Sequence, residues 1–289
     1  MTNAQLSKLV NRHEPHAILD EIKEILLLID KDFDLESIDV AYQSTINLFA
    51  GNYPGYQACN TEYHDLSHAI DTCLTMARLI HGATLCGESF NNRNIYLSLT
   101  SALLHDSGFI QEEDDLQGTG AQYTASHVQR SIDFMNVFAQ NPKHTFTADE
   151  LEASRAMLLC TDLAYTMDEV VYPSSEVELL SKLLGAADLM AQMADPNYLQ
   201  KLLFLYNEFR EAKIGNYASE IDLLRKTVGF YDLVALRLDP LNEMLDRYSR
   251  AHFSARWNIE ENMYQRAIEK RRQYLLEIVN EPDPRVYLI

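Results

Sequence analysis

The chain lacks the features that mark exported, disulfide-bonded or membrane-spanning proteins. Its 289 residues include four cysteines without a CxxC pair, and this spacing favours reduced thiols over a disulfide framework. The longest early apolar run, residues 25–29, is too short to span a bilayer. The sequence does not open with a basic segment followed by an apolar one. We therefore expect a cytoplasmic protein without a membrane partner.

Positive charge is also scarce. The sequence has 24 Lys and Arg against 43 Asp and Glu, a formal net charge of −19. Such a field repels a polyphosphate backbone, so we do not expect a nucleic-acid polymer as a partner. A small phosphorylated substrate meets the same repulsion unless a local cation reverses the sign. A bound metal ion would supply that reversal.

The pattern along the chain contains neither a fixed-period repeat nor an alternating β-branched stretch long enough for a sheet. Apolar residues recur instead at helical spacing in one segment after another. The sequence predicts one all-α domain over residues 1–289. We place its core at about 61–195 and a helical extension at about 196–289, with the terminal helices wrapped on a central bundle.

The segment 95–110, IYLSLTSALLHDSGFI, is the most informative stretch. It is apolar enough to predict a helix buried on most of its surface, yet it carries the adjacent pair His105–Asp106. Burying an imidazole and a carboxylate is costly unless something binds them. A divalent cation would satisfy both side chains. A core histidine bonded to its neighbour or to a backbone carbonyl explains the pair equally well from this segment alone.

A second helix is predicted over residues 61–85, with Thr61 as its N-cap. His64 and His68 are four residues apart and would share one face of that helix. They would bind one metal together, or one would bind it while the other faces the substrate. His81, further along, has no evident partner, and we interpret it as structural.

A third helix is predicted from Ser175 and carries a carboxylate in apolar surroundings. Gly185 and two alanines would let this helix approach another segment closely just before Asp188. A lone carboxylate there needs a partner, and a metal ion is a suitable one.

The candidate residues follow one another as a His, a His-Asp pair and a distant Asp, and this order resembles the HD superfamily of metal-dependent phosphohydrolases. The likeness extends to the class I cyclic-nucleotide phosphodiesterases within that superfamily and spans about residues 61–195. Four segments are similar to motifs of that class: YHDLSH at 63–68 to YHN-x-x-H, ALLHDSG at 102–108 to the apolar run with HD, CTDL at 160–163 to ATD, and AADL at 186–189 to ACDL.

The resemblance implies an HD-domain bundle that hydrolyses a phosphate ester. It implies a small nucleotide or a cyclic nucleotide as the substrate. The ligands it implies for a first metal are His68, His105, Asp106 and Asp188. Asp106 would also bridge to a second, mostly water-held ion, and His64 would give a proton to the leaving oxygen. Zn, Mn, Fe, Mg and Co all suit mixed imidazole and carboxylate ligation, so the sequence predicts one or two divalent ions without choosing among these metals.

Two further residues, Asp162 and His127, would either orient ligands and water or serve as helix caps. An HD oxygenase with two irons would need additional histidines, and His127 alone lies in a comparable place.

Three features depart from the phosphodiesterase pattern. Asp65 replaces the signature's Asn, Phe109 stands where a further His follows the HD pair, and the purine-binding Gln has no counterpart. The Phe109 departure favours an alternative function, a catalytically silent metal- or nucleotide-binding HD regulatory protein. The presence of His64 and of all four ligand positions favours an enzyme.

Overall fold

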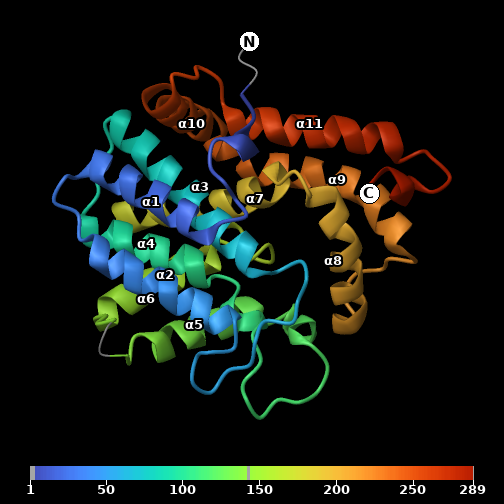
Figure 1. Cartoon of the computed structure of the whole chain (residues 1–289), viewed down its shortest axis with the longest axis horizontal. Coiled ribbons are helices and arrows are strands. Elements are labelled where there is room, and N and C mark those ends of the chain that lie inside the picture. The colour runs from blue at the N-terminus through green and yellow to red at the C-terminus, as the bar shows by residue number, and fades with distance from the viewer. Residues whose placement is uncertain (1–3, 142–143, 289) are drawn as a thin grey trace.

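The computed structural model describes residues 4–141 and 144–288. Eleven α-helices run through these residues, whose β-type contacts are limited to two isolated bridges (Figure 1). The helices are α1 (Pro15–Ile29), α2 (Leu35–Phe49), α3 (Leu66–Leu85), α4 (Asn92–Leu104), α5 (His127–Phe138), α6 (Ala148–Leu159), α7 (Ser175–Ala194), α8 (Tyr198–Ala212), α9 (Glu220–Leu238), α10 (Asn242–Trp257) and α11 (Met263–Ile278). The predicted all-α fold is confirmed.

Helices α3 and α7 form the centre of the molecule. Each is 20 residues long, and α3 is buried without interruption from His68 to Ala83. It is covered by α1, α4, α7 and α10, while α7 also packs against α6 and α11. In Figure 1 the N-terminal helices α1, α2 and α4 lie on one side of this pair, and α8 and α9 lie on the other. Side chains near the start of α3 and in the second half of α7 therefore face each other inside the protein.

Two glycines allow the central helices to approach their neighbours closely. A Cβ atom at Gly185 of α7 would lie 2.4 Å from the carbonyl oxygen of Cys160, at the end of α6. A Cβ atom at Gly82 of α3 would lie 1.9 Å from the carbonyl oxygen of Tyr248 in α10. Both distances are too short for a side chain, so only glycine fits. The close approach expected just before Asp188 is confirmed.

The N-terminus of α3 differs from the prediction. The helix begins at Leu66, and its N-cap is Asp65, whose carboxylate accepts the His68 backbone N–H at 2.8 Å. The Thr61 hydroxyl instead donates to the carbonyl of His64 at 2.7 Å, within the preceding loop. The prediction that His64 and His68 share one helix face is therefore wrong, because His64 lies before the helix.

The helix predicted over 95–110 also ends early. Helix α4 stops at Leu104, His105 is its C-cap, and Ser107–Phe109 form a separate 3-10 turn. The backbone of Asp106 leaves the helical region between them. Because of this break, His105 and Asp106 lie on a turn and not within one continuous helix.

His81 has a partner that the sequence did not indicate. Its Nδ1 lies 3.0 Å from Nδ1 of His252, a fully buried residue of α10. One ring donates this hydrogen bond and the other accepts it. The pair joins α3 to α10. His81 therefore has a structural role, as expected, but it also has a partner, which was not expected.

The hydrophobic interior has two parts. The larger cluster joins α1–α7 with α10 and the start of α11. The second cluster packs α8, α9 and α11 against Tyr63, Leu189 and Met193. The helices after residue 196 therefore cover the flank of α7 that carries Leu189 and Met193.

The four cysteines are free thiols, two buried and two half-buried. Burial raises the pKa of Cys59, Cys73 and Cys160, which keeps these thiols protonated and unreactive. No helix within the described ranges combines the length and the apolarity needed to cross a membrane.

Candidate metal centre

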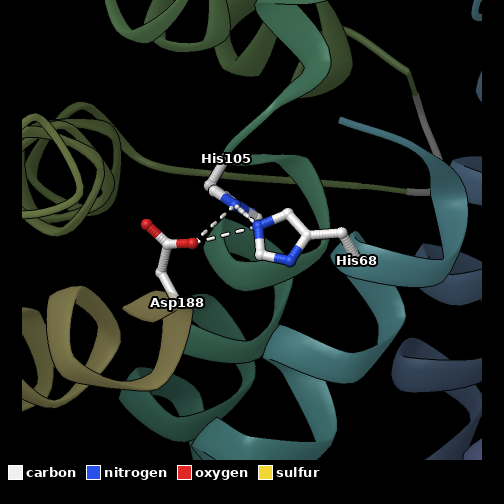
Figure 2. Close-up of side chains that lie close together, drawn as sticks. All are labelled: His68, His105 and Asp188. Carbon is white, nitrogen blue, oxygen red and sulfur yellow. Dashed lines mark hydrogen bonds and ion pairs between the residues drawn. The ribbon is translucent and has the colours of Figure 1, made fainter. Parts of the chain in front are cut away.

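Three side chains from three separate elements point toward one another (Figure 2). His68 lies in the first turn of α3, His105 caps the end of α4, and Asp188 lies in the second half of α7. Nε2 of His68 is 3.0 Å from Oδ1 of Asp188 and 3.2 Å from Nε2 of His105. Nε2 of His105 is 3.6 Å from the same Asp188 oxygen. Both imidazoles are buried, at 6% and 2% exposure.

Asp106, the fourth predicted ligand, borders the same group. Its Oδ2 lies 3.2 Å from Nε2 of His105 and 3.6 Å from Nε2 of His68. This oxygen is buried and has no hydrogen-bond partner among the described residues. A buried carboxylate oxygen without a donor is costly, so a positive charge in front of it is the natural complement.

The spacing of His68, His105 and Asp188 fits a metal ion. Ligand atoms at about 2.0–2.1 Å from a tetrahedral ion lie about 3.3 Å from one another. The five distances given above fall between 3.0 and 3.6 Å. The grouping of His68, His105 and Asp188 therefore has the composition and dimensions of a metal-binding site, with Asp106 at its edge.

Hydrogen bonds fix how His105 faces the centre. Its Nδ1 donates to the carbonyl of Ala102 at 2.8 Å, so Nε2 is the ring atom that faces the other donors. The hydroxyl of Ser131 in α5 donates to the His105 carbonyl and accepts the Gly108 N–H. A Cβ atom at Gly108 would lie 1.9 Å from the carbonyl oxygen of His127. Helix α5 thus holds the whole turn that carries the His-Asp pair.

The electrostatics of the group favour positive charge at its centre. Burial alone would lower the pKa of His105, but the carboxylates of Asp106 and Asp188 raise it well above its ordinary value. Burial likewise opposes ionisation of both carboxylates, but the neighbouring imidazoles lower the pKa of each. Two ionised carboxylates consequently share a buried space with two imidazoles, a charge balance that suits a divalent cation.

Beside this group, His64 forms a pair with Glu208 of α8. The two side chains approach to 2.6 Å between Nδ1 and Oε2, and the other carboxylate oxygen accepts the Tyr63 N–H at 2.7 Å. Burial lowers the pKa of His64, but this hydrogen bond and the charges of Asp106, Glu208 and Asp188 outweigh burial and raise the pKa. The arrangement holds a proton on Nδ1 and keeps the imidazolium form accessible.

Glu208 was not predicted, although a signal for it exists. The buried residues of α8 are Tyr198, Leu199, Leu202, Leu205 and Glu208. An acidic residue on the apolar face of an amphipathic helix indicates a buried partner. Its partner lies 144 positions earlier in the chain.

Phe109 and His127 complete the surroundings of His64. The Phe109 ring is buried and stacks on the ring of His64 at 4.1 Å and on that of His127 at 4.6 Å. Nδ1 of His127 donates to the Thr124 carbonyl at 2.8 Å, and Nε2 lies 3.9 Å from Oδ1 of Asp106. Burial lowers the pKa of His127, which favours a neutral imidazole with a bare Nε2 facing that carboxylate.

Two other polar residues have structural roles. The Asp162 carboxylate accepts the Ala164 N–H at 2.8 Å, within the turn after α6. Asp65, besides capping α3, lies 3.1 Å from Nζ of Lys201. The negative charge that Asp65 brings in place of the signature's Asn is therefore paired.

Comparison with protein families shows a similarity over part of the chain. The model of the family described as Npun_R2479-like matches residues 115–239, less than half of the chain. No curated protein matches the chain. The matched stretch includes Asp188, His127 and Glu208, whereas His64, His68 and the His105–Asp106 pair precede it. Over residues 115–239 the chain is thus similar to the Npun_R2479-like family, whose description names no activity.

Proposed function

We propose that this chain is a metal-dependent hydrolase of small phosphate esters, with a nucleotide or cyclic nucleotide as the substrate class. One observation carries the proposal. The His68, His105 and Asp188 donors converge at ligand spacing with the Asp106 carboxylate at their edge, next to an imidazole that is hydrogen-bonded to a carboxylate. The first group suits a cation, and the second suits proton transfer.

In this proposal His68, His105, Asp106 and Asp188 hold a divalent ion. A bound divalent cation supplies Lewis acidity toward a phosphoryl oxygen and lowers the pKa of a water ligand. Zn, Mn, Fe, Mg and Co remain candidates. Asp106 directs Oδ2 toward the histidine ligands and Oδ1 toward His127, so its carboxylate offers one oxygen to each of two positions. This geometry supports one or two ions.

His64 is the proton donor in the proposed reaction. Glu208 occupies Nδ1, so Nε2 is the ring atom left to give a proton to the departing alkoxide oxygen. Stacking on Phe109 fixes the plane of the ring. Glu208 stabilises the imidazolium and fixes its orientation, as the carboxylate does in other histidine–carboxylate pairs.

The charge of the site must also suit an anionic substrate. In a chain of net charge −19, an anionic phosphate ester needs a local positive charge, which a cation and the His64 imidazolium would provide. The free thiols of the four cysteines support a cytoplasmic location.

The alternative is a metal- or nucleotide-binding regulatory protein without turnover, and one experiment separates the two. Elemental analysis of the purified chain is followed by a screen of cyclic nucleotides, nucleotides and phosphomonoesters with each candidate metal. We expect bound metal and turnover in the wild type and in His16→Ala, an exposed-histidine control. His64→Ala should keep metal and lose turnover. Metal without turnover on the whole panel would favour the regulatory alternative.

A further inference from the structure

One arginine of the N-terminal segment binds two buried carboxylates at the same time. Arg12 lies before α1, and its Nε and Nη2 donate to the two carboxylate oxygens of Asp71, with Nε 3.1 Å from Oδ1. Its Nη1, on the other side of the guanidinium, lies 3.3 Å from Oδ1 of Asp195. Both aspartates are buried, and the Arg12 side chain is 19% exposed. A planar guanidinium can bind two carboxylates in this way because its donors point in fixed directions.

The two carboxylates belong to the helices that carry two of the candidate metal ligands. Asp71 follows His68 by three residues on α3. Asp195 is the C-cap of α7 and follows Asp188 by seven residues. At 3.6 residues per turn, Asp71 lies about 60° around α3 from His68, and Asp195 about 20° around α7 from Asp188. Arg12 therefore joins the ligand-bearing sides of α3 and α7.

A second cation connects the same two helices. Nζ of Lys201 in α8 lies 3.1 Å from the Asp65 carboxylate and 3.8 Å from that of Asp195. Asp65 is the N-cap of α3 and accepts the backbone N–H of His68 at 2.8 Å. The end of α7 is thus linked to the first turn of α3 through Lys201 and to the next turn through Arg12.

The charge of Arg12 bears directly on the separation of the two helices. Asp71 and Asp195 repel each other as like charges, and the guanidinium bound to both replaces that repulsion with attraction to a shared cation. Within about two turns of these carboxylates, Nε2 of His68 and Oδ1 of Asp188 are 3.0 Å apart. Metal–ligand distances tolerate deviations of only about 0.2 Å, so a small displacement of α3 from α7 would disturb ligation.

We propose that Arg12 is a positioning residue for the metal centre. By binding Asp71 and Asp195 together, it holds α3 and α7 at the separation at which His68 and Asp188 can bind one ion. This inference rests on the metal centre of the proposed function. It assigns a role in that centre to a residue outside 61–195, the part of the chain that contains the ligands themselves.

The probe for this role is Co²⁺, one of the candidate metals, whose visible absorption bands report the geometry around the ion. Its dissociation constant is measured by competition with a chelator. Loss of groups that orient metal ligands weakens metal binding by about 10- to 100-fold. For Arg12→Met we expect about a tenfold weaker dissociation constant and a change in the absorption bands of bound Co²⁺.

A second variant leaves the buried pair of Arg12 and Asp71 intact. Asp195→Asn has nearly the same shape, and its amide oxygen can still accept the Asn197 N–H that the carboxylate accepts at 2.8 Å. It removes the negative charge at the end of α7 to which Arg12 and Lys201 are bound. Asp195→Asn should therefore fold and should weaken Co²⁺ binding in the same direction as Arg12→Met.

The matched control is a similar ion pair between two other helices. Arg256 of α10 binds both carboxylate oxygens of Glu21 in α1, at 3.3 and 3.0 Å. Arg256→Met, like Arg12→Met, should lower the midpoint of urea unfolding, because each variant leaves a buried carboxylate unpaired. Only Arg12→Met should change the dissociation constant and the spectrum of Co²⁺.

The outcomes separate this inference from the proposed function. Absence of Co²⁺ binding to the wild-type chain would overturn the metal centre, and the role of Arg12 with it. A wild type that binds Co²⁺, with the same dissociation constant in Asp195→Asn, would overturn the role of Arg12 alone, whether or not Arg12→Met folds. An equal loss of affinity in Arg256→Met would also overturn it, because any ion pair between helices would then have the same effect.

Discussion

Replacing Glu208 with Gln removes one negative charge behind His64 and leaves the shape of the side chain unchanged. In the wild type, one carboxylate oxygen accepts the Tyr63 N–H and the other lies 2.6 Å from Nδ1 of His64. The amide oxygen of Gln would keep the Tyr63 bond, so its NH₂ group would face Nδ1. Nδ1 would then have to accept a hydrogen bond, which holds the imidazole neutral.

The size of the effect follows from the hydrogen bond that is lost. A hydrogen bond to a charged group contributes about 1.5–3 kcal/mol, which corresponds to about a 10- to 150-fold loss of turnover. A bound cation would offset the charges of Asp106 and Asp188, so Glu208 becomes the main support of the imidazolium. Since Glu208 raises the pKa of His64, its replacement lowers that pKa. Activity that needs protonated His64 is lost as pH rises through its pKa, so the basic limb should move to lower pH.

The assay compares two phosphate esters as substrates, one with an alkoxide leaving group and one with p-nitrophenolate. The profile of kcat/KM against pH is measured for metal-loaded wild type, Glu208→Gln and Glu211→Gln, an exposed control one turn along α8. Glu208→Gln should slow the alkoxide ester much more, because p-nitrophenolate leaves without a proton. Metal content should be unchanged. An equal loss on both esters, or a basic limb that does not move, would refute the role given to this pair.

Three other predictions concern the supports of the centre. His105→Ala and Asp106→Ala should abolish metal content by elemental analysis, and metal retained in both would remove the site assignment. Asp65→Ala should lower the free energy of unfolding by about 1 kcal/mol in urea titrations, because α3 loses its N-cap, whereas Asp65→Asn should cost only a few tenths. Gly185→Ala should destabilise the fold by at least about 2 kcal/mol, because its Cβ would meet the Cys160 carbonyl at 2.4 Å; a neutral effect would contradict that contact.

The features that could be predicted from sequence are those with a local signal. Helical periodicity indicated the all-α fold, and polar residues in apolar segments singled out His105, Asp106 and Asp188. Such residues stand out because burying them requires a partner. The group of His68, His105 and Asp188 accordingly assembles as the order of motifs suggested.

The features that could not be predicted depend on contacts between distant segments. Thr61 and Asp65 are both good N-caps, and only the hydrogen bond of Thr61 to the His64 carbonyl decides between them. The partners of His64 and His81 lie 144 and 171 positions away. Periodicity carries no information on which buried polar groups pair across such separations.

Phe109 shows how a departure from a motif changes meaning in the structure. In the sequence it occupies the position at which the phosphodiesterase pattern has a further His after the His-Asp pair. That departure favours a catalytically silent protein. In the fold its buried ring stacks on both His64 and His127 and so orients the proposed proton donor. We propose His127 as the ligand of any second ion next to Oδ1 of Asp106, because its Nε2 lies 3.9 Å from that oxygen.

We predict that binding of a second ion would depend on His127. If a second divalent ion binds, His127→Ala should reduce the metal content from two equivalents to one, while the ion held by His68, His105 and Asp188 remains. His13→Ala, an exposed-histidine control, should leave the metal content unchanged. Two equivalents retained in His127→Ala would assign the second ion to other ligands. One equivalent in both the wild type and the variant would restrict His127 to holding Asp106 in place.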